Sequence, residues 1–266
     1  INQLNLTNMK KYFIALISVF FLISAFAQKK KITSEELKPS DLSGLEFRSV
    51  GPAFMSGRIA DIAINPENEN EWYVAVGSGG VWKTVNSGTT WKPIADNESF
   101  YSTGCITIDP HNTSKVWLGT GENVGGRHVG IGHGVYVSEN GGKSWKSMGL
   151  KSSEHISKII VSPKDPNIVF VASQGPLWSS GGDRGLFKTN DGGKTWKNVL
   201  SVNEWTGVTD IVIDQLNPDI LYAATWQRHR NVASYMGGGP GTSIYKSTDH
   251  GKNWIEIKDG LPTSNL

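Results

Sequence analysis

Three carboxylates, those of Asp61, Asp210 and Glu122, stand where they could hydrolyse a glycosidic bond. That reaction needs two carboxyl groups across a cleft, one protonated as the general acid and one ionised as the nucleophile or base. Asp61 and Asp210 occupy equivalent positions in two similar segments, and Glu122 lies in a glycine-rich stretch. The structural alternative is that Asp61 and Asp210 accept hydrogen bonds from nearby backbone or pair with Arg58.

A second set of residues could bind a ligand without transforming it. Three glycine-rich segments, at 119–133, 174–184 and 225–240, each combine an aromatic or imidazole ring with at least one arginine. Aromatic faces stack on sugar rings or peptide side chains, and the guanidinium fork pairs with carboxylates. The alternative is that these side chains order their own loops. The candidate ligand-binding residues are Arg58, Arg127, His128, Trp178, Arg184, Trp226, Arg228, His229 and Arg230.

The composition disfavours metal, disulfide and nucleic-acid chemistry. His128, His133 and His229 do not have the spacing of a compact metal-binding motif. The 26 basic and 24 acidic residues nearly balance, which gives no attraction to nucleic acid, and the single cysteine provides no disulfide framework. We therefore expect no metal, no cofactor and no nucleic-acid partner.

The candidates belong to a fourfold internal repeat. The pattern S/T-x-D/N-x-G-x-S/T-W, which we call the box, occurs four times, and its tryptophans are roughly 50 to 60 residues apart. The Asp or Asn can accept backbone N–H groups of a tight turn, and the glycine tolerates positive φ. We assign a structural role to the box residues Asn86, Trp91, Asn140, Trp145, Asp191, Trp196, Asp249 and Trp254.

Each repeat also contains four expected strands. In the first repeat, β-branched residues predict strands at 59–64, 72–76 and 80–83, and a fourth strand follows the box. Four antiparallel strands in about 50 residues make one blade of a β-propeller. We therefore predict an all-β propeller that is nearly free of helices, with its long second-to-third-strand loops on the face opposite the box turns. The predicted blades are at about 56–97, 102–150, 155–201 and 207–258.

The box resembles the Asp-box of the BNR-repeat families, which include sialidases, xyloglucan-cleaving glycosidases and the sortilin/VPS10 receptors. The resemblance covers residues 44–262, and it is closest to large secreted repeat proteins of Bacteroidetes-type bacteria that are described as glycosyl hydrolases or as sortilin-like. It implies a β-propeller, and in these families the box itself is structural.

Two departures from these families favour binding over hydrolysis. Xyloglucan-cleaving relatives carry a catalytic Asp in a Thr-Asp-x-Gly-Gly stretch after the second strand of the first blade. The matching stretch here, Val76-Gly77-Ser78-Gly79-Gly80, has no carboxylate. The sialidase Phe-Arg-Ile-Pro motif is matched only in part, at 47–52, and no arginine triad can be assigned.

The N-terminus is typical of an export signal. Met9-Lys10-Lys11 is basic, 12–26 is apolar, and Ala25-Phe26-Ala27 has small residues at the two positions that a signal peptidase recognises. We expect a cleaved signal peptide at 9–27, with a buried helix as the alternative, and a linker at 28–43. Residues 1–8 are expected to precede the native start.

The expected ring is larger than four blades. Residues 263–266 are expected to begin another blade of a propeller with about seven blades, or of two propellers in tandem. We predict a secreted or periplasmic protein, without membrane attachment after cleavage, whose long loops bind a glycan or polypeptide and whose other partners are the remaining blades. The alternative is a xyloglucanase- or sialidase-like glycoside hydrolase that is completed by other blades, and we do not expect this region to be an enzyme by itself.

Overall fold

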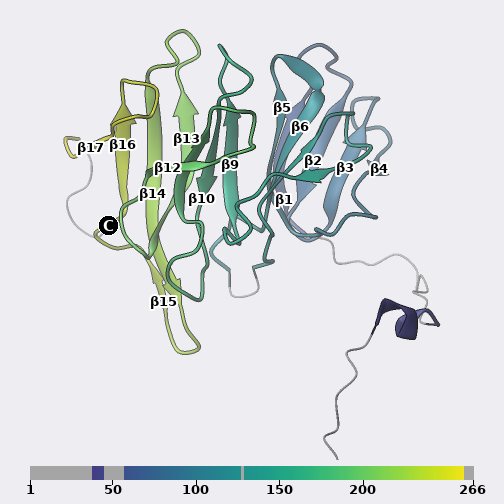
Figure 1. Cartoon of the computed structure of the whole chain (residues 1–266), viewed down its shortest axis with the longest axis horizontal. Helices are drawn as coiled ribbons and strands as arrows, with labels where there is room; N and C mark the ends of the chain where they lie inside the picture. Colours follow the sequence, from purple (N-terminus) through teal and green to yellow (C-terminus); the bar gives the residue numbers. More distant parts are fainter. Residues whose placement is uncertain (1–37, 45–56, 127–128, 261–266) are drawn as a thin grey trace, which may run out of the picture. The chain divides into compact units, whose positions relative to one another are not determined.

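The computed structural model of this chain describes residues 38–44, 57–126 and 129–260 (Figure 1). The chain divides into two compact units, Ile1–Pro52 and Ala53–Leu266. In the first, the short 3-10 helix η1 (Pro39–Leu42) follows Lys38, whose N–H donates to the Asp41 carboxylate at 2.9 Å. Within the described ranges, no helix is long and apolar enough to cross a membrane. The predicted signal peptide and the predicted start of another blade lie outside these ranges.

The described residues of the second unit form four antiparallel sheets, which follow one another along the chain. Blade 1 contains β1 (Ile59–Ile64), β2 (Trp72–Val76), β3 (Gly80–Thr84) and β4 (Lys92–Pro93). Blade 2 contains β5 (Thr103–Asp109), β6 (Asn112–Thr120), β7 (Val135–Ser138) and β8 (Lys146–Ser147). Blade 3 contains β9 (Ile156–Val161), β10 (Val169–Ser173), β11 (Gly185–Thr189) and β12 (Lys197–Leu200). Blade 4 contains β13 (Thr206–Ile213), β14 (Leu221–Arg230), β16 (Ser243–Ser247) and β17 (Ile255–Ile257).

The predicted propeller with four-stranded antiparallel blades is confirmed, with one addition in blade 4. The sequence predicted a long loop at 225–240, but β14 continues through this segment to Arg230 and pairs with β15 (Tyr235–Gly237). β14 extends past the end of the blade and turns back into β15, so the segment forms a hairpin (Figure 1). This hairpin carries Trp226, Arg228 and Arg230.

The box turns are stabilised by their own side chains. In the third box, Thr189 Oγ1 donates to Asp191 Oδ1 at 2.6 Å and accepts the Gly193 N–H at 2.9 Å. Asp191 Oδ1 also accepts the Thr195 N–H at 2.9 Å. The same three bonds recur in the other boxes. Each box glycine has positive φ, between 77° and 89°, which a side chain would disfavour.

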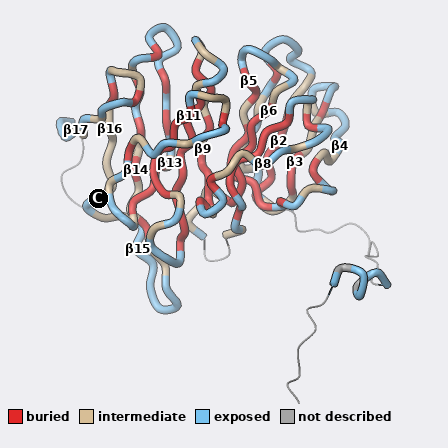
Figure 2. The backbone as a smooth tube through the Cα atoms, in the orientation of Figure 1, coloured by how far each residue is buried: buried red, intermediate tan, exposed pale blue. Residues whose placement is uncertain are grey.

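Three apolar cores lie between successive blades. We call the side of a blade that faces the preceding blade its leading face, and the other side its trailing face. The core between blades 1 and 2, for example, joins Tyr73 and Val81 of the blade 1 trailing face to Ile106 and Leu118 of the blade 2 leading face. Figure 2 shows the buried backbone concentrated in the central strands, with exposed turns at both ends.

The box tryptophans extend these cores toward the preceding blade. Trp196 packs on the core between blades 2 and 3, edge-on to Trp117, and its indole N–H donates to the Met148 carbonyl at 2.7 Å. Trp145 makes the same kind of bond to the Ile94 carbonyl of blade 1 at 3.3 Å. The box therefore both closes its own turn and fastens neighbouring blades together.

We expect Trp196→Ala to lower the free energy of unfolding by about 2–4 kcal/mol, since it removes a packed ring and a hydrogen bond between blades. Trp91 is the matched control, because its side chain is 39% exposed in blade 1, and Trp91→Ala should cost less than about 1 kcal/mol. Urea unfolding followed by circular dichroism measures both. Equal losses for the two variants would contradict the interblade role of Trp196.

Acid should weaken the two boxes that contain aspartate. Hydrogen bonds from Thr189 and Thr195 hold the pKa of Asp191 well below its ordinary value, and bonds from Asn253 do the same for Asp249. A lowered folded-state pKa contributes stability above about pH 4 that is lost as the pH falls toward the folded-state pKa. We expect the double variant with Asp191→Asn and Asp249→Asn to lose less free energy of unfolding than wild type as the pH falls, which urea unfolding at a series of pH values measures. Parallel curves for wild type and variant would refute this linkage.

Candidate functional site

The candidate carboxylates Asp61 and Asp210 form backbone hydrogen bonds at bulges in the first strands of blades 1 and 4. Asp61 Oδ1 accepts the Ile62 N–H at 2.9 Å, and its Oδ2 accepts the Ile106 N–H of blade 2 at 3.1 Å. Asp210 Oδ1 accepts the Ile211 N–H at 2.8 Å. This is the structural arrangement that the sequence left as the alternative, except that Arg58 pairs elsewhere.

Glu122 is buried at the junction of blades 1 and 2. Its carboxylate forms an ion pair with Arg58 and accepts the Ser78 hydroxyl at 2.6 Å. A Cβ added at Gly77 would lie 2.9 Å from Glu122 Oε1. The Glu122 carboxylate therefore takes the space of a side chain at position 77, and the loop of blade 2 is clamped to the short turn of blade 1. Sequence reasoning missed Ser78 because nothing marks its long-range partner.

Arg184 holds its own loop in place through hydrogen bonds to backbone carbonyls. Its guanidinium is buried and donates to five backbone carbonyls, which include Gln174 at 2.7 Å in its own loop and Trp205 at 3.2 Å in blade 4. Burial lowers its pKa to about 10, so the group stays charged at neutral pH. These bonds leave little of the guanidinium for a ligand, and they shape the 174–184 loop.

Arg228 joins loops from two blades. The side chain is fully buried, its Nη1 donates to the Val124 carbonyl of blade 2 at 3.1 Å, and its guanidinium lies 5.3 Å from the centre of the Trp226 ring. Near its charge lie Glu154 and His155, which the sequence analysis did not select. Burial and the charge of Arg228 lower the pKa of His155 to about 3, which keeps its ring neutral, while burial raises the pKa of Glu154.

The loops of blades 3 and 4 carry the exposed rings of Trp178 and Tyr235. Trp205 is half-buried, and its ring lies against that of His229 with the ring centres 4.1 Å apart and the planes tilted by 46°. Arg230 lies 4.4 Å from the centre of the Tyr235 ring. Such aromatic surfaces suit the C–H faces of sugars. Trp205 and Tyr235 were absent from the sequence-based set, although a Trp directly before the first strand of a repeat, as Trp205 is before β13, could have signalled one of them.

Two of the predicted binding residues, Arg127 and His128, lie outside the described residues. His133 contributes its backbone N–H, which donates to Thr120 Oγ1 at 2.8 Å. Among the described residues, no group of three or more His, Cys, Asp or Glu side chains could hold a metal ion.

Comparisons with known proteins support the fold. Residues 133–264 match the family model described as sortilin, neurotensin receptor 3. The chain is 24% identical to a probable oligoxyloglucan-reducing end-specific xyloglucanase of Neosartorya fischeri, over 80% of this chain and 25% of that protein. It is 26% identical to xyloglucanase Xgh74A of Acetivibrio thermocellus, over 74% of this chain and 25% of that protein. The chain is a β-propeller of the sortilin and xyloglucanase kind.

Solved structures support the same fold. An ancestral GH74 enzyme matches with a TM-score of 0.59 and 20% identity, over 78% of this chain and 27% of that one. The GH74 enzyme of Niastella koreensis matches with a TM-score of 0.55 and 19% identity, over 76% of this chain and 29% of that one. This sortilin- and xyloglucanase-like propeller thus spans about a quarter of the length of the curated relatives it matches.

We expect Arg184→Ala in this sortilin- and xyloglucanase-like propeller to free the 174–184 loop, because several buried carbonyls lose their donor at once. The free energy of unfolding should fall by about 2–4 kcal/mol, and chymotrypsin should cleave after Trp178 in the otherwise folded protein. Arg230→Ala is the control, since Arg230 is only half-buried and lies against one ring. An unchanged cleavage rate in Arg184→Ala would show that the loop is held by other contacts.

Proposed function

We propose that this chain supplies sugar-binding subsites of a xyloglucanase-like glycoside hydrolase. The observation that carries the proposal is a set of rings on the loops of blades 3 and 4, namely Trp178 and Tyr235, which are exposed, and Trp205, which is half-buried beside His229. Flat rings at the surface of rigid loops bind the pyranose units of a neutral polysaccharide by stacking. The curated relatives are named as xyloglucanases, which favours the hydrolase alternative over an independent binding module.

The hydrolytic step itself is assigned to the whole protein. A glycosidase needs a protonated and an ionised carboxyl group on opposite sides of the scissile bond. Asp61 and Asp210 are engaged by backbone N–H groups, and Glu122 is buried against Arg58 and Ser78. In this proposal the region binds and orients the glycan, and Glu122 fixes the blade 2 loop beside the sugar chain.

The location of the substrate fits the expected export. Plant xyloglucan and related glucans are polymers too large to enter a cell intact, so a protein that binds them must meet them outside. The signal peptide predicted at 9–27 and a secreted or periplasmic location are part of the same proposal.

Binding without turnover is the expected behaviour of this chain. Affinity electrophoresis in gels that contain xyloglucan should show retardation, while reducing-sugar assays should show no release. Trp178→Ala and Trp205→Ala should each weaken binding about tenfold, the effect of losing one stacked ring worth about 1–1.5 kcal/mol. Trp91→Ala, which removes an exposed ring of blade 1, is the control and should bind as wild type.

Two results would overturn the proposal. One is the absence of retardation by any β-glucan, and the other is retardation that Trp178→Ala and Trp205→Ala leave unchanged. Sugar release abolished by Asp61→Asn or Asp210→Asn would instead assign catalysis to carboxylates that the structure engages with backbone.

Polypeptide recognition is a second candidate function, favoured by the sortilin model that matches residues 133–264. The loops in that range also carry Arg230 against Tyr235, a pair that could hold a peptide carboxylate and an apolar side chain. Retention of peptides, but not of glucans, by the immobilised chain would favour this candidate.

A further inference from the structure

Arg228 is a fully buried cation that uses only part of its hydrogen-bonding capacity. Its Nη1 donates to the Val124 carbonyl at 3.1 Å, whereas its Nε and Nη2 have no hydrogen-bond partner among the described residues. The N–H groups of Nε and Nη2 lie on one edge of the guanidinium and point in the same direction. Arg228 therefore keeps free the pair of parallel donors that binds a planar anion or a halide ion.

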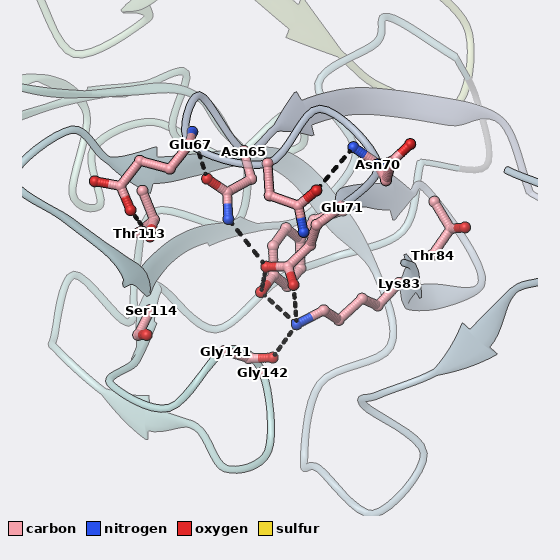
Figure 3. A network of polar contacts seen from close by, with 12 residues as sticks. Asn65, Glu67, Asn70, Glu71, Lys83, Thr84, Thr113, Ser114, Gly141 and Gly142 are labelled. Carbon is pink, nitrogen blue, oxygen red and sulfur yellow. Dashed lines mark hydrogen bonds and ion pairs between the residues drawn. The ribbon is translucent and has the colours of Figure 1, made fainter. Parts of the chain in front are cut away.

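Lys83 shows how this protein satisfies a half-buried cation with its own groups. Its Nζ pairs with Glu71 at 3.2 Å, and it donates to the Tyr73 hydroxyl at 2.8 Å and to the Gly141 carbonyl at 3.3 Å (Figure 3). The lysine thus meets three acceptors, one of them a carboxylate. Arg228 is more deeply buried and has one carbonyl as its hydrogen-bond acceptor.

The buried positive charge around Arg228 exceeds the negative charge. Burial, together with the nearby charge of Arg184, lowers the pKa of Arg228 to about 10, so this guanidinium stays charged at neutral pH. Glu154 acts on both guanidiniums, but burial raises its own pKa. Within the described part of the chain, no carboxylate oxygen lies within 4.0 Å of either arginine. Two buried cations thus share one acid, and an unpaired buried charge is costly.

The Arg228 guanidinium lies among loops of three blades. Val124 belongs to the loop of blade 2, Arg184 to the loop of blade 3, and Trp226, whose ring centre is 5.3 Å from the guanidinium, to the hairpin of blade 4. The side chain is fully buried at this junction. Its free donors are therefore a feature of the packed loops and do not arise from the outer faces of blades 1 and 4.

We propose that Nε and Nη2 of Arg228 bind a small anion, either a halide ion or a small carboxylate such as formate, at this junction. The anion accepts both parallel N–H groups and compensates the charge that Glu154 does not. Full burial of the side chain excludes larger ligands. Glu154 and Tyr235 lie near the Arg228 charge and are partly exposed, so their movement gives a small ion access. The bound anion stabilises the packing of the three loops.

Thermal unfolding of this chain at constant ionic strength tests the proposal, with chloride or formate replacing a bulky sulfonate buffer anion. Tm should rise with the concentration of chloride or formate and then saturate. The rise should be about 5–10 °C at a concentration about a hundredfold above Kd. A response at lower concentrations of formate than of chloride identifies a carboxylate site, and the reverse identifies a halide site. A wild type with the same Tm in all three salts would overturn the proposal.

Arg228→Lys is the matched variant, because it keeps the charge and removes the parallel donors. It should need at least about tenfold more anion than wild type for half of the rise in Tm. Arg230→Lys is the control, since Arg230 lies on the same strand, and its Nε also lacks a partner among the described residues. This control should respond as wild type. Equal half-saturation in Arg228→Lys and wild type would refute the assignment to Arg228.

A direct measurement on wild type does not depend on the folding of a variant. The chain should broaden the NMR line of chloride or of isotopically labelled formate, and an excess of the other anion should narrow it. Glu154→Gln should bind the anion more tightly, because it removes a nearby negative charge. If Glu154 is itself the partner of Arg228, Glu154→Gln would lower Tm and wild type would broaden neither line, and the proposal would fail.

Discussion

The packing of blade on blade rests on a glycine that has positive φ and lies against an aromatic ring of the preceding blade. Two constraints meet at this residue, because a side chain at Gly193 or Gly251 would be disfavoured by the backbone conformation and would also collide with Trp117 or Phe170. The hydroxyl and carboxylate or amide of the box hold the turn in the conformation that presents this glycine. Local hydrogen bonding thereby sets the distance between successive sheets.

The long loops on the opposite side depend on that spacing. Arg184 and Arg228 donate hydrogen bonds to carbonyls of neighbouring loops and blades. These two predicted ligand-binding residues therefore hold the loops together. Backbone carbonyls are suitable partners for the buried Arg184 guanidinium, since they satisfy its donors without a second buried ion. Trp178 and Tyr235 remain exposed on the loops that these arginines hold.

The junction of blades 1 and 2 depends on one buried carboxylate, that of Glu122. A side chain at position 77 and the carboxylate of Glu122 compete for the same space, so this chain has a glycine on one strand end and an acid on the neighbouring loop. The acid is buried, paired with Arg58 and bonded to Ser78. A carboxylate held by an arginine and a hydroxyl stabilises the junction between the two blades.

The sequence by itself determined the blades, because the box bonds and the strand alternation act between residues a few positions apart. Asn86 and Asp191 make their predicted turn bonds for that reason. Only the tertiary structure decided the roles of Glu122 and Arg228, whose partners Arg58 and Val124 lie 64 and 104 residues away along the chain. A residue's type states which bonds it can make. Which bonds it does make depends on the strands that packing brings beside it, and no local pattern encodes that.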